Sequence, residues 1–228
     1  MNSKSERFFD FIKKENTKRL FAFVFYTLFV VVFMKINLPL AVEGICFIIQ
    51  MFIMLSGGVV YMDEYLDKVF KKIEGKLAKS IIQEIKKLAK EIAMFIPVLL
   101  ISIFITSFMA TLITIGKPAN QIRVEASFYQ LPILSSIDII IIAPIIEEFI
   151  FRFLPYRFIK NKTLYIIVST VVFAAMHVLN DPNPLYYIWI YMITPLYWGY
   201  RYHKTNDILV PIFMHSFDNL IGVLLMIL

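Results

Sequence analysis

Long apolar stretches, separated by short polar connectors, set the pattern of this chain. A helix that crosses a membrane needs about 20 mainly apolar residues, and the chain offers such stretches repeatedly from near its start to its end. On that basis we predict about seven spans: 20–36, 38–60, 92–115, 133–155, 164–180, 184–200 and 208–227. The expected fold is therefore all-α, a polytopic transmembrane helix bundle that forms a single membrane domain over residues 1–228.

Residues 61–91 follow a different pattern from the predicted spans. Clusters of Lys and Glu alternate there with Val, Phe, Ile and Leu at helical spacing, which is typical of an amphipathic helix or helix pair. Such a segment lies on a membrane surface or extends from it. We expect a basic amphipathic cytoplasmic connector here, and divide the domain into N-terminal spans with this connector (1–132) and a C-terminal core (133–228).

The basic residues indicate how the spans are oriented. Cytoplasmic loops of membrane proteins are enriched in Lys and Arg, and the basic segments of this chain fall on one side if the predicted spans alternate. These segments are the N-terminus with Lys13, Lys14, Lys18 and Arg19, the connector 61–91, the loop with Arg157, Lys160 and Lys162, and the loop with Arg201 and Lys204. We predict a cytoplasmic N-terminus and an outer C-terminus. The richness in Lys, Ile and Phe favours a bacterial cytoplasmic membrane.

Composition supports the membrane class and narrows the partners. The chain is 59% hydrophobic with a mean hydropathy of +0.73, far from an ordinary soluble domain. The formal net charge is +6, but the basic residues lie between apolar runs instead of on one soluble face, which favours contact with anionic lipid over nucleic acid. Cys46 is the only cysteine, which excludes an intrachain disulfide and a thiolate metal cluster.

The stretch "APIIEEFIFRF" places ionisable groups inside a predicted span, just after Pro144, where a kink is expected. A charge at the centre of a span costs at least ~2.5 kcal/mol, so each such group needs a partner or a function. Glu148 and Arg152 are one helical turn apart and can pair, whereas Glu147 points about 100° away. We expect Glu148 to be a structural carboxylate and Glu147 to be free to act. The alternative is a Glu–Arg clamp between helices, with Glu147 facing water.

Two further polar pairs occupy later predicted spans. "FAAMH" places Phe173 and His177 one turn apart, and "HSFDN" does the same for His215 and Asn219. Two donors on one helix face can converge on one oxygen, as an oxyanion site requires. Each pair alone is also explained without chemistry, by an interfacial histidine or by hydrogen bonds between helices.

Taken together, Glu147, His177 and His215 offer a base, a second polar group and an electrophilic stabiliser, which suits hydrolysis of an amide by activated water. The same three residues suit zinc or another divalent cation with a position open for water. We favour direct activation by glutamate, because no H-E-x-x-H motif is present. Counted from the predicted helix starts, His177 lies roughly 21 Å along its span and His215 roughly 12 Å, so the two meet only if a helix tilts or starts later.

The three motifs, "EEFIFR", "FAAMH" and "HSFDN", together resemble those of the CPBP family of intramembrane endopeptidases, also called the Abi or type II CAAX prenyl protease family. That family carries E-E-x-x-x-R, F-x-x-x-H and H-x-x-x-N/D in this order, and the resemblance covers about residues 133–228.

This resemblance implies an activity and a role for each motif residue. The family is described both as glutamate-dependent and as metal-dependent, so the metal question stays open. The implied roles are activation of water by Glu147 with help from His177, stabilisation of the oxyanion by His215 and Asn219, and organisation of the site by Glu148, Arg152 and Phe173.

We therefore predict an intramembrane endopeptidase that acts on a membrane-associated peptide or small protein. Eukaryotic relatives cleave prenylated CAAX tails, while bacterial members are associated with peptide maturation, bacteriocin self-immunity and signalling. Two alternatives remain: a non-proteolytic bacteriocin-immunity or peptide-binding membrane protein, and a proton-coupled transporter, for which buried ionisable residues are also typical. The paired repeats expected of a transporter are not evident in the sequence.

Overall fold

The computed structural model describes residues 24, 77–113 and 116–228. Within 77–113, side chains are described from residue 81 onward. Several predicted features lie outside these residues: the spans 20–36 and 38–60, residues 61–76 of the connector, and Cys46. Across the described ranges the chain forms helices and contains no strand. The all-α prediction is confirmed for that part of the chain.

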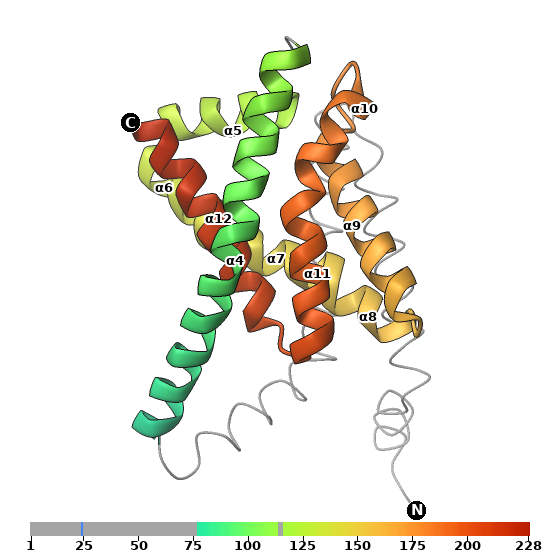
Figure 1. Cartoon of the computed structure of the whole chain (residues 1–228). Coiled ribbons are helices and arrows are strands. Elements are labelled where there is room, and N and C mark those ends of the chain that lie inside the picture. Colours follow the sequence, from blue (N-terminus) through green and yellow to red (C-terminus); the bar gives the residue numbers. More distant parts are fainter. Residues whose placement is uncertain (1–23, 25–76, 114–115) are drawn as a thin grey trace, which may run out of the picture. The chain divides into compact units, whose positions relative to one another are not determined.

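The described helices follow one another with short connections (Figure 1). The α-helices are α4 (Leu77–Ile113), α5 (Ala119–Gln130), α6 (Pro132–Ile137), α7 (Ala143–Glu148), α8 (Leu154–Phe158), α9 (Lys162–Val178), α10 (Pro184–Tyr187), α11 (Ile193–Thr205) and α12 (Leu209–Ile227). Two π-helical segments, η1 (Asp138–Ile142) and η2 (Phe149–Phe153), flank α7, and a 3-10 turn, η3 (Ile188–Tyr191), precedes α11.

The chain divides into two compact units, Met1–Glu84 with Leu154–Lys160, and Ile85–Phe153 with Asn161–Leu228. In the first unit, the structure describes residue 24, the start of α4 and the short stretch that contains α8. Every residue of the sequence motifs that were singled out for chemistry lies in the second unit.

Two helices of the described part are long and apolar enough to cross a membrane, Ile81–Leu112 within α4 and Leu209–Ile227 in α12, while α9 is apolar but shorter. Large apolar side chains are exposed on α4 and along α6–α7, among them Leu100, Ile101, Phe104, Phe108, Ile133, Leu134, Ile141 and Ile145. An apolar surface of this kind fits lipid better than water. These features support a membrane protein, while about seven spans and their orientation stay predictions.

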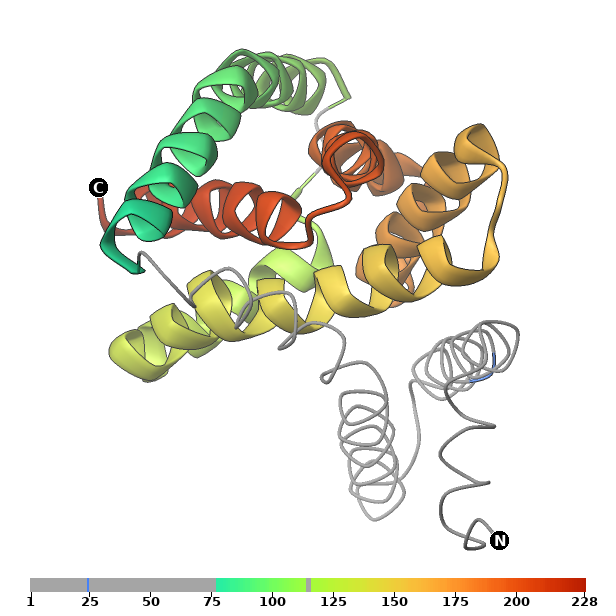
Figure 2. The ribbon, with the colours of Figure 1, turned by 90° about the horizontal axis from the view of Figure 1, so that it is seen from below.

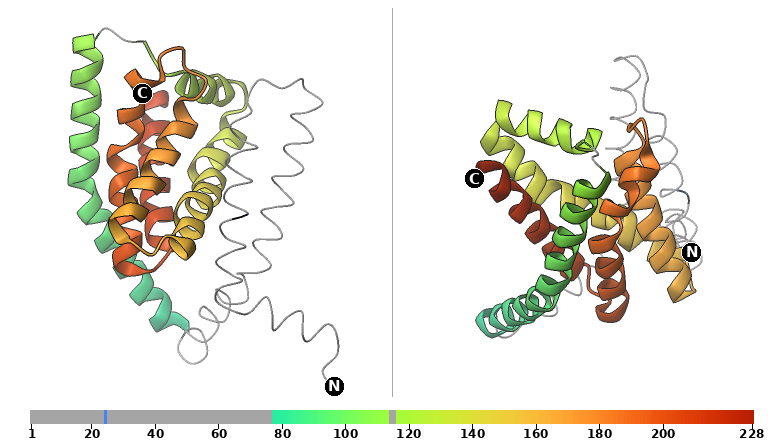
Figure 3. Two further views of the ribbon diagram at one scale, coloured as in Figure 1. Left: turned by 90° about the vertical axis from the view of Figure 1, so that its right-hand side faces the viewer. Right: turned by 45° about the horizontal axis from the view of Figure 1, so that its top comes forward.

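α4 extends further than the sequence pattern suggested. Residues 77–91 were expected to belong to the amphipathic connector, but they continue into the span 92–115 as one helix. The sequence pattern did not predict this continuity. Hydropathy changes where the helix leaves the apolar region, but the backbone hydrogen bonds of the helix continue. Pro97 lies inside the helix and removes one backbone donor. α4 bends along its length (Figure 3).

The expected single span 133–155 is instead a helical path interrupted by the two π segments. Each π segment ends two residues before a proline, Pro144 or Pro155. A proline lacks an N–H group, and its ring crowds the carbonyl of the preceding turn. The wider π turn relieves this crowding, and such single turns often occur at functional sites. The irregularity expected at Pro144 is therefore present as a π segment just before it.

α9 and α12 both pack against α11, and α12 also packs against η1 and α7 (Figure 2). The Asn161 side chain accepts a hydrogen bond from the Leu164 N–H, at 2.9 Å, and so caps the start of α9. At the end of α11, Asn206 adopts a left-handed conformation with φ of 48°, which terminates the helix. These caps fix where the helices that carry the polar motifs begin and end.

The expected span 184–200 is divided into α10, η3 and α11, and α11 runs on to Thr205. His203, which the sequence placed in a solvated loop, instead lies in the last turn of α11 and is partly buried. Burial, together with the positive charges of Lys162 and Lys204, lowers the pKa of His203. The lowered pKa favours the neutral form of His203. The side chain does not line the cavity that Glu147, His177 and His215 border.

Polar contacts join the segments between the helices at two separate places. Two ion pairs join the first half of α4 to the α11–α12 region: Glu91 with Arg201, at 2.6 Å, and Lys87 with Asp207. Separately, Asp181 after α9 accepts the backbone N–H of Ala119 at the start of α5, at 2.6 Å. The contacts therefore join connectors at each of these places, while the membrane side on which each place lies stays a prediction.

Candidate active site

The centre of the site is a buried ionic cluster between α7, η2 and α12. Glu148 and Arg152 are both completely buried, and the Arg152 Nε lies 3.4 Å from the Glu148 Oε2. The other carboxylate oxygen, Oε1, lies 3.0 Å from the His215 Nδ1. The pairing expected from the one-turn spacing is present, and His215 joins it from another helix. Glu148 and Arg152 thus form an ion pair, and the hydrogen-bond contact of Glu148 is with His215; burial of charges is costly without such partners.

Arg152 also links three segments of the chain through backbone carbonyls. Its guanidinium donates to the carbonyl oxygens of Phe151, Ser169 and Pro195, each at 3.3 Å. The same group lies 5.0 Å from the centre of the Phe173 ring, within range of a cation–π contact. Arg152 therefore holds η2, α9 and α11 together around Glu148.

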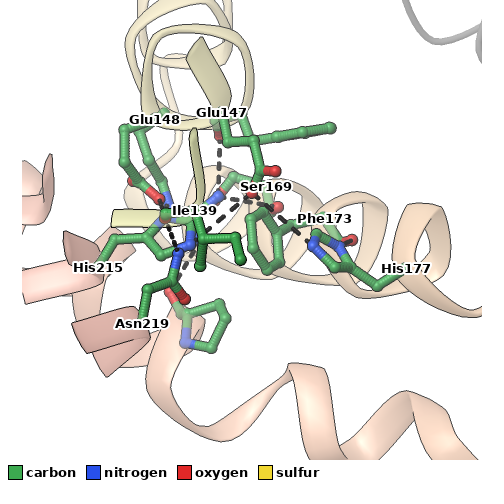
Figure 4. A network of polar contacts seen from close by, with 11 residues as sticks. Ile139, Glu147, Glu148, Ser169, Phe173, His177, His215 and Asn219 are labelled. Carbon is green, nitrogen blue, oxygen red and sulfur yellow. Dashed lines mark hydrogen bonds and ion pairs between the residues drawn. The ribbon is translucent and has the colours of Figure 1, made fainter. Parts of the chain in front are cut away.

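Glu147 lies on the adjacent face and contacts both histidines. Its Oε2 is 3.7 Å from the His177 Nε2 and 3.8 Å from the His215 Nε2. The Glu147 side chain keeps 26% of its surface exposed, whereas Glu148 has none. Figure 4 shows the two glutamates beside each other, with His177 and His215 approaching from different helices. The two neighbouring carboxylates thus have different surroundings, as the sequence predicted.

In each imidazole, the hydrogen-bond partner of Nδ1 determines whether Nε2 donates or accepts. The His177 Nδ1 lies 2.8 Å from the Phe173 carbonyl oxygen, which can only accept, so Nδ1 carries the proton. The His215 Nδ1 lies 3.0 Å from a carboxylate oxygen of Glu148 and donates to it when the ring proton is on Nδ1. In each neutral ring Nε2 is then an acceptor, and both acceptors face one oxygen of Glu147. Three acceptor atoms so close together favour a shared proton or a bridging donor.

Aromatic rings hold the two imidazoles in place. Phe173 contacts both, with ring centres 4.4 Å from His177 and 5.7 Å from His215. Trp198 stacks on His215 at 4.3 Å, and Tyr191 stacks on His177 at 4.9 Å. The sequence had singled out Phe173 but not Trp198 or Tyr191, because nothing in their local spacing connects α11 or η3 with a histidine on another helix.

Asn219 makes a different contact from the one its motif suggested. Its Nδ2 donates to the carbonyl oxygen of Ile139, in η1, at 2.7 Å. Asn219 lies one turn after His215 on α12, so the two were expected to point at one oxygen. At least one N–H of the Asn219 amide is instead occupied by the protein backbone.

A cavity of about 440 Å³ is bordered by Glu147, His177 and His215. Its wall also includes polar side chains from four further elements: Ser102 and Thr106 on α4, Asn120 and Gln121 on α5, Asp138 on η1, and Thr194 on α11. Asp218, next to Asn219, lines the cavity as well and pairs with Thr194 through a side-chain hydrogen bond. The cavity is large enough for several side chains of a peptide, and polar enough for water.

The structure brings together all the residues that the sequence motifs singled out. The different positions of His177 along α9 and of His215 along α12 do not keep them apart, since both Nε2 atoms lie within 3.8 Å of the Glu147 Oε2 and α12 is inclined in the bundle (Figure 1). Distance along an inclined helix is not the same as depth. The roles assigned to these residues remain hypotheses, whereas their proximity is a property of the fold.

Glu147, His177 and His215 are also the residues that the sequence offers as metal ligands. Within the described residues, no three His, Cys, Asp or Glu side chains are arranged to hold a metal ion. The His215 Nδ1 and the His177 Nδ1 are taken by protein acceptors, so a metal would have to be bound through both Nε2 atoms and Glu147. Nothing in this geometry favours a metal over acid–base chemistry.

One family model matches the part of the chain that contains the polar motifs. The model of the Rce1-like family, described as type II CAAX prenyl endopeptidase Rce1-like, matches residues 129–221. This range contains all three polar motifs and agrees with the resemblance recognised from the residues.

Two proteins of Lactococcus lactis are similar to this chain over segments of 85 and 94 residues. UPF0177 protein YaiH is 35% identical over 85 residues, 37% of this chain and 36% of that protein. UPF0177 protein YxdF is 34% identical over 94 residues, 41% of this chain and 51% of the relative. The similarity thus spans about a third to a half of the relatives' own lengths. No solved structure gives a significant match.

Proposed function

From the match of residues 129–221 to the Rce1-like family model, we propose that the protein is an intramembrane endopeptidase of the CAAX/CPBP type. The observation that carries the proposal is the convergence at Glu147. One oxygen of a partly exposed carboxylate lies within 3.8 Å of two imidazole nitrogens, beside a polar cavity. Acid–base hydrolysis requires this combination of a base, orienting groups and room for a substrate.

In the proposed reaction, Glu147 takes a proton from water as the water oxygen attacks the carbonyl carbon of the peptide bond. The carbonyl oxygen becomes an oxyanion in a tetrahedral intermediate. The proton then passes from Glu147 to the amide nitrogen, the C–N bond breaks, and an acid and an amine leave. No covalent acyl-enzyme forms, and Glu147 ends in its starting protonation state.

The histidines position the water and stabilise charge. His177 is fixed by the Phe173 carbonyl, and His215 by Glu148, so each ring presents Nε2 towards the Glu147 carboxylate. A water molecule between these atoms can donate to two of them at once, which aligns its oxygen for attack. A protonated Nε2 can donate to the oxyanion, which is the largest single contribution in many acyl-transfer enzymes.

The proposed chemistry does not require a metal, which leads to a testable expectation. Dialysis of the purified protein against a chelator should leave kcat/KM for a cleaved peptide within about twofold of the starting value, because no ligand is removed from the site. The measurement compares chelated protein, untreated protein and chelated protein to which zinc has been returned. A large loss that zinc restores would instead support the metal alternative.

The cavity also indicates the chemistry of the substrate. Asp138 and Asp218 line it, and none of its lining residues in the described part is Lys or Arg. A carboxylate in a partly desolvated cavity favours a cationic partner. We therefore propose a membrane-associated peptide or small protein that places Lys or Arg close to the cleaved bond.

Asp218→Asn is expected to weaken selection for such substrates. A charge-assisted hydrogen bond to the substrate would be lost, so the preference for Lys or Arg over Gln at the selected position should fall about tenfold. Cleavage of a peptide library by wild type and variant, quantified by mass spectrometry, measures this preference. Glu125→Gln on α5, which does not line the cavity, is the matched control. An unchanged preference in Asp218→Asn would refute this assignment.

A further inference from the structure

The backbone at η1 leaves one carbonyl without its usual donor. Ala143 donates its N–H to the Asp138 oxygen, five residues earlier, as a π turn requires. In the same register, the next carbonyl, that of Ile139, would accept the N–H of residue 144. That residue is Pro144, which has none. An unpaired carbonyl in an apolar segment is costly.

Asn219 supplies the missing donor. Its Nδ2 lies 2.7 Å from the Ile139 oxygen, so an amide on α12 replaces the backbone donor that Pro144 lacks. Figure 4 shows the Asn219 side chain directed at Ile139. The contact is therefore part of the backbone hydrogen bonding of η1.

This bond connects the two halves of the candidate site. On α12, Asn219 follows His215 by one turn, and on the other side Ile139 precedes Glu147 by about two turns. A shift of α12 relative to α7 would change the separation of the Glu147 Oε2 and the His215 Nε2, now 3.8 Å. Displacements of about 1 Å in a catalytic site can lower the rate about 100-fold.

We propose that Asn219 is a positioning residue that replaces the N–H missing at Pro144 and thereby holds Glu147 in reach of the histidines. The activity part of this inference rests on the proposed endopeptidase function, whereas the hydrogen-bond part does not. It differs from the oxyanion role implied by the family motif, in which Asn219 would contact the substrate directly.

A double-mutant cycle with Pro144→Ala tests this inference. Alanine restores an N–H at residue 144, which can donate to Ile139 and make the Asn219 amide dispensable. The proteins are wild type, Asn219→Ala, Pro144→Ala and the double variant, purified in one detergent. Thermal unfolding gives Tm for each, and cleavage of a library-derived peptide gives kcat and KM.

With Pro144 present, Asn219→Ala is expected to lower Tm by about 3–6 °C and kcat by about 100-fold, with little change in KM. With alanine at residue 144, the same change should lower Tm by less than about 1 °C, and most of the loss in kcat should disappear. Asn219→Asp, which has nearly the same size but no N–H, should behave like Asn219→Ala. Ser216→Ala, on the same helix but outside the cavity lining, should act equally in both backgrounds.

The two readouts separate the parts of the proposal. Equal losses of Tm in both backgrounds would overturn it even if none of the proteins cleaves a peptide, because the unfolding measurement does not depend on activity. A Tm loss that depends on residue 144, together with a kcat loss that does not, would overturn the positioning role and support direct contact with the oxyanion.

Discussion

Glu147→Gln is expected to abolish peptide cleavage and to leave the fold intact. The substitution keeps the size of the side chain but removes the base that accepts the proton of water, and loss of a general base lowers rates by about 100-fold to 10⁴-fold. The Glu147 side chain is partly exposed and lies 3.7 and 3.8 Å from its two nitrogen neighbours, so the loss of these contacts should change Tm little. Steady-state cleavage of a library-derived peptide and thermal unfolding of the same samples measure both quantities.

Glu125→Gln provides the control for this prediction. Glu125 is on α5, pairs with Lys117 at 2.7 Å, and lies outside the cavity lining. Its replacement removes one carboxylate but keeps a side-chain oxygen that can accept from Gln121 of the cavity wall, 3.0 Å away, so activity should be unchanged. Similar rates for wild type and folded Glu147→Gln would contradict the assignment of Glu147 as the base.

Arg152→Met is expected to have the largest effect on stability. Arg152 and Glu148 are both fully buried, and Arg152 also donates to three backbone carbonyls. Removing one partner of a buried ion pair typically costs about 3–5 kcal/mol, because the other charge remains buried without compensation. We expect a fall in Tm of about 10 °C or more, or a failure to recover folded protein.

Two companion variants show whether charge is the cause. Lys117→Met breaks an ion pair in which the lysine is largely exposed, and should change Tm by about 2 °C at most. Adding Glu148→Gln to Arg152→Met removes the orphaned charge, so the double variant should be more stable than Arg152→Met alone. If the second substitution destabilises the protein further, the loss in Arg152→Met arises from packing and not from the buried carboxylate.

The sequence predicted the polar centre of the site because its pairs are local. Glu148 with Arg152, and Phe173 with His177, are one turn apart, and a helix brings such residues together whatever surrounds it. The different environments of Glu147 and Glu148 were predicted for the same reason, since adjacent residues face different sides of a helix. Those relations depend only on helical geometry.

Contacts between helices could not be predicted in this way. The stacking of Trp198 on His215, and the bond from Asn219 to Ile139, depend on how α11, α12 and η1 pack. The π segments also escaped prediction, since Pro144 indicates an irregularity but not its form. Knowledge of the spacing along one helix gives no information on the rotation of its neighbour.

The limits of the helices were predicted less well than their existence. α4 continues through residues that were taken for a surface connector, and 184–200 is divided by a 3-10 turn. A polar stretch can remain helical in water, and an apolar stretch can be interrupted, so hydropathy alone locates apolar regions and not helix ends. The binding-only and transporter alternatives stay predictions, and cleavage of a peptide bond is the activity that separates an endopeptidase from both.

Cleavage in water enriched in heavy oxygen tests the central claim most directly. Wild type and Glu147→Gln, each verified as folded, are incubated with a membrane-peptide library, and the products are identified by mass spectrometry. We expect wild type to yield products with one heavy oxygen in the new C-terminal carboxylate, and Glu147→Gln to yield essentially none. Equal amounts of labelled product from both proteins would contradict activation of water by Glu147.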